Sequence, residues 1–314
     1  KSLDISGKRF ARKKAATEAR KAASSALMVN YLNVIRNIHI AYAEVLSESE
    51  SLKLAKDQEN LAKQVLRTVS KRVDAARESE IQRAKAIVAY ESSIIASSLE
   101  EQQLRSSKQK LAKLIGKERL DVSLDHSHFF DLEAPKPIES YKKMLDHSPI
   151  LERYLHLSNE KKFAFDLERA QKISDLKVKI GIKEFRSNNE QALVAGLSIP
   201  LPIFNWNQGN ISRAGAELSQ ARNNQLQTKL SLEQNLIEEW RNWQISYFTA
   251  EKLKTVILPT AEKAFKLSRL GYEKGKLPYL EVLDAQRTLF EARSKYHKSL
   301  KQYHIARANI ELIT

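Results

Sequence analysis

The distribution of glycine and proline constrains the fold more than any other feature of this sequence. The chain has 314 residues, yet only 8 are glycine and 7 are proline, and most of these gather in a few short groups. The stretches between the groups reach about sixty residues, whereas an ordinary globular helix has about 11–12. The sequence therefore predicts a mainly α protein that is built from very long helices.

Apolar residues in these stretches recur at steps of three and four, which is the spacing of a heptad seam. The seam of the first stretch runs through Leu27, Tyr31, Val34, Ile38, Ala41 and Val45, and that of the last runs through Val282, Leu289, Tyr296, Tyr303 and Ile310. We expect long helices over 8–73, 79–115, 149–174 and 210–272, a short helix near 138–146, and a final helix after a turn at 274–277. Pro259 should kink or divide the helix over 210–272, because proline lacks the backbone N–H.

The period changes from helical to alternating over residues 177–200. Val178, Ile180 and Ile182 alternate with Lys177, Lys179 and Lys183, which is strand spacing. A turn-like segment over 187–190 follows, and then a second alternating run from 192 to 199. The second run has small or apolar residues on both faces. The sequence therefore predicts one β-hairpin that must pair with something or face lipid.

The order of long helix, turn and returning helix occurs twice in the chain. Aligning the two turns pairs Val73 with Tyr272, Ala76 with Gly275, Ser79 with Pro278 and Ile81 with Leu280. We therefore divide the chain into a first repeat over 1–148 and a second over 149–314, which holds a helix, the hairpin over 177–200 and a long helical hairpin over 210–314. One such helical hairpin cannot bury both sides of its seam, so the halves must pack together and, we expect, against other copies.

The formal net charge of +15 suggests polyanionic partners such as nucleic acid or lipopolysaccharide. The lysines and arginines are spread among glutamates and aspartates along the helices, however, and no nucleic-acid-binding motif accompanies them. Solvated helical faces explain this charge better than a nucleic-acid site does. A coiled-coil scaffold or nucleic-acid-binding protein remains the alternative function, although a scaffold has no use for a lipid-compatible hairpin.

Neither catalysis nor a cofactor is expected. The chain has no cysteine, which excludes disulfides, thiolate metal sites and a cysteine nucleophile. It also has no nucleophile elbow, phosphate loop or zinc-hydrolase motif. Asp125, His126 and His128 form only a weak pattern for a metal site, within an expected polar connector. No run of about 18 apolar residues predicts a transmembrane helix, and the first residues lack the apolar region of a signal peptide.

Four segments resemble, in order, the TolC family of outer-membrane efflux proteins. The clearest is 271–286, which is similar to the family's periplasmic tip turn and the start of its final helix. Residues 196–210 resemble the last barrel strand running into the second long helix. Residues 7–9 resemble the matching join of the first half, and residues 145–151 resemble the linker between the halves. Residues 200–205 and 257–259 are most similar to the CzcC-like branch, which serves heavy-metal cation efflux.

The resemblance implies a passive duct in a tripartite efflux system of a Gram-negative bacterium. Very long antiparallel helical hairpins would form a periplasmic α-barrel, and the small β-hairpin would contribute to an outer-membrane β-barrel. Three copies would form a homotrimer that meets outer-membrane lipid and binds no nucleic acid. A periplasmic adaptor (membrane fusion) protein would connect it to an inner-membrane pump of the resistance-nodulation-division type. Small molecules or heavy-metal cations would be the cargo.

The same resemblance points to site residues at the two tips. Glu281 and Asp284 match an acidic ring at the periplasmic entrance, although an acidic first helical turn explains them equally well. The tip turns, with Tyr272, Gly275, Leu277, Pro278 and Leu280 in one repeat and Ala76, Ser79 and Ile81 in the other, are expected to dock the adaptor. Gly275 should adopt a conformation that larger residues avoid, so the counterpart Ala76 predicts a first turn of different shape. Tyr272 either ties neighbouring helices in a gate or is a core tyrosine.

Only residues 1–6 precede the join at Gly7, where the resemblance predicts a further helix and a first β-hairpin. We therefore expect a truncated or processed form. With one hairpin per copy the barrel edges would stay unpaired, so a chain of this extent is not expected to conduct.

Overall fold

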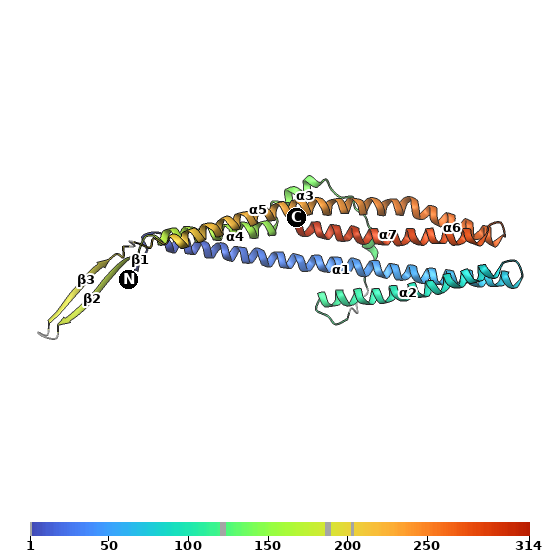
Figure 1. The fold of residues 1–314 in the computed structure, drawn as a ribbon, viewed down its shortest axis with the longest axis horizontal. Coiled ribbons are helices and arrows are strands. Elements are labelled where there is room, and N and C mark those ends of the chain that lie inside the picture. The colour runs from blue at the N-terminus through green and yellow to red at the C-terminus, as the bar shows by residue number, and fades with distance from the viewer. Residues whose placement is uncertain (1, 120–123, 186–189, 202–203) are drawn as a thin grey trace. The chain divides into compact units, whose positions relative to one another are not determined.

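The computed structural model describes residues 2–119, 124–185, 190–201 and 204–314, and it confirms the long helices (Figure 1). Their observed bounds are α1 Lys8–Asp74, α2 Glu80–Leu114, α3 Ile138–Leu145, α4 Pro149–Gln171, α5 Gln208–Lys252, α6 Leu258–Glu273 and α7 Tyr279–Ile313. Pro149 stands at the first position of α4, where a missing N–H costs nothing. None of the helices in these ranges combines the length and the apolar character needed to cross a membrane.

Pro259 divides the second long helix, as predicted. Five residues, Leu253–Ile257, form a π-helical turn between α5 and α6. Pro259 is the second residue of α6, which begins at Leu258 directly after the turn. A proline removes one hydrogen bond from the helical ladder and crowds the carbonyl four residues earlier, so the local widening to a π turn accommodates the ring.

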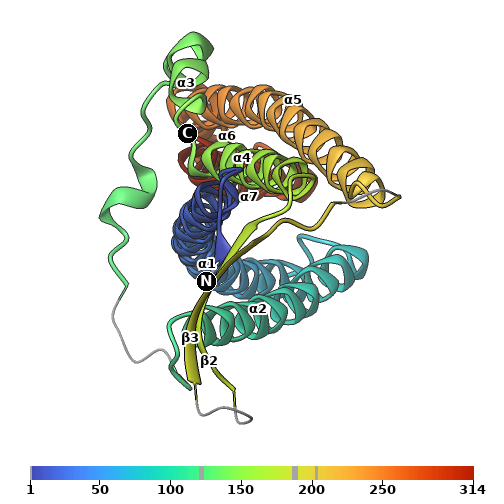
Figure 2. The same cartoon turned by 90° about the vertical axis from the view of Figure 1, so that its left-hand side faces the viewer.

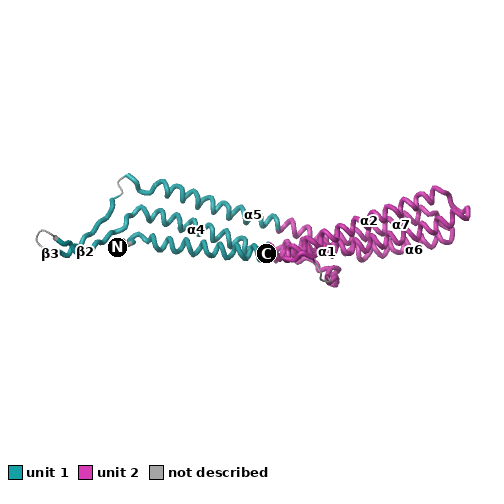
Figure 3. Tube along the Cα trace, turned by 90° about the horizontal axis from the view of Figure 1, so that it is seen from below, with its two compact units in different colours: residues 1–31, 141–235, 313–314 teal, residues 32–140, 236–312 magenta. Residues whose placement is uncertain are grey.

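The chain divides into two compact units, which Figure 3 shows in different colours. Unit 1 comprises residues 1–31, 141–235 and 313–314, and unit 2 comprises residues 32–140 and 236–312. Each unit takes segments from both predicted repeats. The division of the sequence into repeats at 148/149 is a statement about ancestry, and it stays a prediction.

Unit 1 holds the small sheet and the helices that support it. Strands β2 (Leu176–Phe185) and β3 (Glu190–Ser198) pair antiparallel, which confirms the hairpin, and the predicted turn residues 187–189 lie outside the described residues. A short strand β1 (Ser2–Leu3) adds to β2 in the order β1-β2-β3 and was not predicted. Between the supporting helices, Nδ1 of His156 on α4 lies 2.8 Å from Oε2 of the buried Glu18 on α1. This contact lowers the pKa of the Glu18 carboxyl.

Unit 2 is a set of long helices in two hairpins, in which α2 lies beside α1 and α7 lies beside α6 (Figures 1 and 2). One cluster of buried residues, around Ala41, Val45 and Leu111, joins α1 to α2. A second joins the two tips, and a third surrounds the connector between α2 and α3. The apolar spacing of the last helix is confirmed as core, because Val282, Leu289, Tyr296, Tyr303 and Ile310 are all buried.

The beginning of the predicted α1 seam is not buried within the single chain. Leu27 is 71% exposed, and Tyr31 and Val34 are exposed as well. The heptad spacing marks an apolar stripe on α1, but no helix of the same chain covers that part of the stripe in the described structure. Nearby core positions are instead Ala22 and Val29, which lie on another side of the helix.

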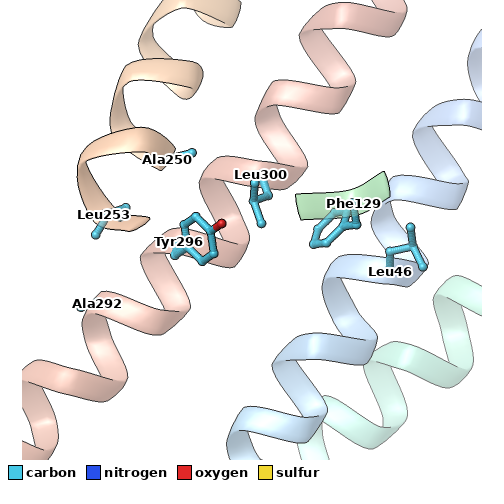
Figure 4. Packing of buried hydrophobic residues seen from close by; sticks show 7 residues of the cluster. All are labelled: Leu46, Phe129, Ala250, Leu253, Ala292, Tyr296 and Leu300. Carbon is cyan, nitrogen blue, oxygen red and sulfur yellow. The ribbon is translucent and has the colours of Figure 1, made fainter. Parts of the chain in front are cut away.

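The described residues 124–137 of the connector between α2 and α3 pack against the helices of unit 2. The connector contains a short 3-10 helix, Ser127–Phe130, which buries Phe129 to 1% exposure. Figure 4 shows the Phe129 ring between Leu46 of α1 and Leu300 and Tyr296 of α7. Tyr303 of α7 donates its hydroxyl to the Glu133 carbonyl and accepts the Glu133 N–H, at 3.1 and 2.9 Å. The Tyr42 hydroxyl also donates to the Asp125 carbonyl, and the Trp240 indole donates to the Lys136 carbonyl, both at 2.9 Å. The buried ring and these hydrogen bonds together hold the connector on the helices.

Candidate functional site

The second tip turn is closed by backbone hydrogen bonds that require a left-handed residue. Lys276 donates its N–H to the Gly271 carbonyl and Gly275 donates to the Tyr272 carbonyl, at 2.8 and 2.9 Å. This pair of bonds is the Schellman motif, whose residue past the helix end takes a positive φ. Gly275 has φ +70° there. Gly271 is needed for packing instead, because a Cβ at this position would meet Cδ1 of Leu277 at 2.6 Å.

The expectation of a differently shaped first turn is wrong. Arg77 donates to the Arg72 carbonyl and Ala76 donates to the Val73 carbonyl, both at 2.8 Å, so the same motif ends α1. Ala76 adopts φ +54°. An L-residue with a Cβ pays roughly 1–2 kcal/mol for this region. The hydrogen bonds that close the turn and the packing of the tip therefore outweigh the local preference of alanine.

Both tips belong to one packed cluster within unit 2. Val69 of α1, Ala86 of α2, Tyr272 of α6 and the pair Tyr279 and Val282 of α7 are buried together. The rings of Tyr272 and Tyr279 lie 5.7 Å apart, and burial raises the pKa of the Tyr279 phenol to about 12. The two turns, about 200 residues apart in sequence, are thus held as one end of the unit.

Arg72 connects the two turns by polar contacts, and no sequence signal singled it out. Its guanidinium donates to the Tyr272 carbonyl at 3.1 Å and lies over the Tyr272 ring at 4.7 Å from the centroid. Its Nε also lies 3.5 Å from a carboxylate oxygen of Glu78. Tyr272 itself is 4% exposed, burial raises its pKa, and its hydroxyl has no hydrogen-bond partner among the described residues. This placement favours the core-tyrosine interpretation over a gate within one chain.

The two acidic residues lie at the start of α7 in different surroundings. Glu281 is exposed in the first turn of the helix, where the helix dipole favours a negative charge. Asp284 is also exposed, and Arg287 donates to its carboxylate at 2.9 Å. The positive charge of Arg287 therefore offsets part of the negative potential of Asp284.

The remaining tip residues present an apolar surface. Ile81 at the start of α2 and Leu280 at the start of α7 are exposed, as are Ser79 and Pro278 before them. Leu277 is partly used in packing against Gly271 and is still exposed in part. Exposed aliphatic side chains at the first turn of two neighbouring helices are available for contact with another protein.

A groove of about 910 Å³ runs along unit 2 between α1, α2 and α7. Small side chains form much of its wall, notably Ala55, Ala89, Ser93 and Ala96. Asp284 and Arg287 lie on its α7 side. Small residues let a further helix approach the backbone closely, so the groove has the form of a helix-binding surface.

The β-hairpin has two chemically different faces. Directly opposed residues of an antiparallel pair share a face, and the register pairs Val178 with Leu197, Ile180 with Ala195 and Ile182 with Leu193. The other face pairs Lys177 with Ser198, Lys179 with Gly196 and Lys183 with Ala192. Large aliphatic residues of the first face are exposed in the isolated chain. One side of the hairpin is therefore suited to lipid and the other to water.

The segment Asp125–His128 does not gather around a common centre. The Nδ1 of His126 lies 3.1 Å from a carboxylate oxygen of Glu50, whereas the Nδ1 of His128 lies 3.1 Å from Asp131. Asp125 accepts the N–H of Ser127 at 2.8 Å. Across the described ranges, no three His, Asp or Glu side chains come close enough together to hold a metal ion.

The comparisons with known proteins agree with this geometry. Residues 142–314 match the family model of the outer membrane efflux protein. The cobalt-zinc-cadmium resistance protein CzcC of Cupriavidus metallidurans is 31% identical over 311 residues, which are 99% of this chain and 74% of that protein.

Solved structures share the fold at lower sequence identity. The outer membrane protein VceC of Vibrio cholerae superposes with a TM-score of 0.85 at 17% identity, covering 99% of this chain and 77% of that one. The open state of the MtrE outer membrane channel of Neisseria gonorrhoeae has a TM-score of 0.80 at 16% identity, covering 99% and 72%. These matching proteins are efflux channels and not enzymes.

The family assignment decides against a coiled-coil scaffold or a nucleic-acid-binding protein. It rests on a family model that covers more than half of the chain and on a relative that matches almost all of it. The chain therefore belongs to the outer membrane efflux protein family and is the channel component of an efflux system in the outer membrane and periplasm of a Gram-negative bacterium.

Proposed function

We propose that this protein is the passive export duct of a tripartite system for divalent heavy-metal cations. The observation that carries the proposal is the 31% identity to a cobalt-zinc-cadmium resistance protein across almost the whole chain. In this role the duct performs no catalytic step, and the energy comes from an inner-membrane pump of the resistance-nodulation-division type. A periplasmic adaptor protein joins pump and duct.

The two faces of the hairpin support a place in the outer membrane. A lysine that faces lipid at the bilayer midplane costs roughly 2–4 kcal/mol. Lys177, Lys179 and Lys183 share one face, so burying that face in lipid would cost several times this amount. The other face is aliphatic except for Glu184 opposite Gln191 near the turn, and a carboxylate away from the midplane costs less than a lysine at the midplane. We therefore assign the aliphatic face to lipid and the lysine face to the channel lumen.

Uncovered apolar stripes support a homotrimer. Leu27 and Tyr31 of α1, and Leu226 and Leu230 of α5, are exposed in unit 1. Large apolar side chains that repeat at helical spacing are rarely left in water. Two further copies of the same chain would cover these stripes, with helices packed side by side around a central tunnel.

The tip turns and the groove support docking of the adaptor. Ile81 and Leu280 provide exposed aliphatic contacts at the two turns. The groove between α1, α2 and α7 offers a wall of alanine and serine to which a helix of the adaptor can pack closely. We therefore place the docking surface at residues 76–81 and 272–280 and in the adjoining groove.

Glu281 and Asp284 supply the attraction for cations at the periplasmic entrance in this proposal. Three copies of Glu281 would concentrate negative potential in a narrow aperture. Asp284 contributes less, because Arg287 contacts its carboxylate. Replacement of Glu281 by Gln should therefore slow cation entry more than replacement of Asp284 by Asn.

Metal tolerance tests the proposal. A Gram-negative host without its own duct, but with a matching heavy-metal pump and adaptor, should regain growth on cobalt, zinc and cadmium when it expresses the protein. The double variant Ile81→Glu and Leu280→Glu should lose this tolerance while it still reaches the outer membrane. Tolerance restored to none of the three metals would contradict the metal cargo. Full tolerance in the tip variant would contradict only the docking surface.

A further inference from the structure

We propose that the boundary between the strands and the helices of unit 1 is a cationic surface that binds anionic phospholipid headgroups in the periplasmic leaflet of the outer membrane. This strand–helix boundary comprises residues 4–14, 166–175 and 204–213. The inference rests on the proposed function, since it requires the β-hairpin to lie in the outer membrane. It concerns the attachment of the protein to its bilayer and not the cargo.

The sheet brings the three parts of the boundary together. Ser2 of β1 and Ser198 of β3 are both opposite Lys177 of β2, so the chain joins the helices at the same end of all three strands. At this end, Nζ of Lys8 at the start of α1 lies 2.7 Å from a carboxylate oxygen of Asp175, just past α4. Figure 1 shows the starts of α1 and α5 and the end of α4 at the base of the sheet.

Cations outnumber acids in the strand–helix boundary. Its three segments hold eight lysines and arginines and four aspartates and glutamates, which gives a net charge of +4. Five of the cations lie within residues 8–14, and α1 has no acidic residue in its first turn. The helix dipole favours negative and not positive charge at this end of a helix. The pattern therefore indicates a negative partner outside the chain.

The four acids of the boundary are already engaged or partly buried. Asp175 forms its ion pair with α1, and Glu168 accepts a hydrogen bond from the Asn207 side chain at 2.7 Å. Asp4 accepts backbone N–H groups at the start of α1, at 2.6 and 3.1 Å. Asp166 is half-buried on α4. These carboxylates offset part of the positive charge but leave an excess at the surface.

Three cations of α1 carry this excess. Arg9, Arg12 and Lys13 are exposed, and within the described ranges no carboxylate forms an ion pair with them. Arg9 and Lys13 each lie two positions from the buried Ala11, which places them on the opposite side of the helix. Their charged groups are thus directed away from the core of unit 1.

Aromatic rings accompany the cations. Nζ of Lys14 lies 4.3 Å from the centroid of the Phe10 ring, and Nζ of Lys172 lies 5.0 Å from that of Trp206. Phe10, Phe204 and Trp206 are exposed. This combination suits the interface of a bilayer, where rings and aliphatic stems reach the acyl chains and the charged ends reach the phosphates.

A second copy of the chain complements this charge less well than a phospholipid surface does. The only acid among residues 204–232 is Glu217, which contacts Lys161 at 3.1 Å, and the same stretch holds three lysines and arginines. The first half of α5 in a neighbouring copy would therefore bring further cations. Phosphates, by contrast, lie level with the boundary when the strands are in the bilayer and the helices are in the periplasm.

Spin-labelled lipids test the inference on the assembled protein. The protein, purified from outer membranes, is reconstituted in phosphatidylcholine vesicles that contain a trace of spin-labelled phosphatidylglycerol or phosphatidylcholine. The electron paramagnetic resonance spectrum gives the fraction of each label that is immobilised at the protein surface. Phosphatidylglycerol should associate about twofold or more strongly than phosphatidylcholine, because lysines and arginines near an anionic surface are attracted to it. The preference should fall in about 1 M KCl, because salt screens exposed charges.

Three variants locate the preference. Arg12→Gln/Lys13→Gln should bring the association ratio at least halfway to one, whereas the charge-conserving Arg12→Lys/Lys13→Arg should retain the parent ratio. The matched control Lys142→Gln/Lys143→Gln removes two exposed lysines from α3, away from the sheet (Figure 1), and should also retain it. An equal fall in the boundary variant and in the control would overturn the assignment to the boundary.

The contrary results are distinguishable. Equal immobilisation of both lipids by the parent protein would overturn the lipid-binding surface and leave a second copy as the partner of the cations. A preference that inorganic phosphate abolishes, while KCl of the same ionic strength does not, would show a site for free phosphate and would overturn the inference as well. Immobilisation of neither lipid would contradict the place of the hairpin in the membrane, and with it the proposed function.

Discussion

Replacing Phe129 with alanine should release the connector from unit 2 without unfolding its helices. Phe129 is 1% exposed and packs with Leu46 of α1 and with Tyr296 and Leu300 of α7. Removing a fully buried phenylalanine costs roughly 3–5 kcal/mol. Leu124, Phe130 and Leu132 of the connector are only partly buried against the same cluster. The remaining contacts are hydrogen bonds, notably the pair between Tyr303 and Glu133, each worth about 1 kcal/mol net. The Phe129 side chain is therefore the largest single contribution to docking of the connector.

Hydrogen exchange measures this release at a defined atom. The Glu133 amide donates to the Tyr303 hydroxyl in the docked connector. Because every 1.4 kcal/mol is tenfold in an equilibrium constant, a loss of about 3 kcal/mol should lower the protection of this amide roughly a hundredfold or more. Amides in the middle of α7 should keep their protection, since the helix retains its own hydrogen bonds.

His128→Ala is the matched control, because the His128 side chain is one residue away and 87% exposed. It should leave the protection of Glu133 unchanged. Unchanged protection in Phe129→Ala would refute the reasoning that this ring holds the connector. Equal loss in α7 would show that the ring supports the helices themselves.

Three further predictions concern the tips and His297, a half-buried histidine of α7. Gly275→Ala should lower the free energy of unfolding by about 1 kcal/mol, because alanine is strained at φ +70°. Ala76→Gly should be neutral or slightly stabilising, because glycine adopts φ +54° freely. The thermal unfolding midpoints of the two variants check this difference. Arg72→Gln should raise hydrogen exchange at both tip turns, because it removes the charged contacts to the Tyr272 carbonyl and to Glu78, and equal exchange in variant and parent would refute the link between the turns. Burial lowers the pKa of His297 from its ordinary value of 6.5, so the unfolded chain binds a proton at this side chain more readily than the folded chain does. The contribution of neutral His297 to the free energy of unfolding is therefore fully present above pH 6.5 and is lost as the pH falls. His297→Gln should therefore show a smaller drop in unfolding midpoint between pH 7.5 and 5.5 than the parent protein, and an equal drop would contradict the assignment.

Local patterns were sufficient to predict the long helices and the hairpin of this fold. A heptad seam and a period of two depend on residues a few positions apart, so the long helices, the hairpin β2–β3 and the division of the helix at Pro259 are visible without tertiary information. The chemistry of the hairpin faces was visible for the same reason. Glycine at 275 predicted its own left-handed backbone because few other residues adopt it freely.

Tertiary packing decided what the patterns left open. Phe129 contacts helices more than 80 residues before it and more than 160 residues after it, and no local period marks such a partner. Ala76 takes a left-handed conformation that its own preference disfavours, because the packed tip and the closing hydrogen bonds outweigh the local cost. The same limit explains Leu27 and Tyr31. Their spacing correctly marks an apolar stripe, but only the arrangement of whole helices determines whether a stripe of this chain is covered by the chain itself.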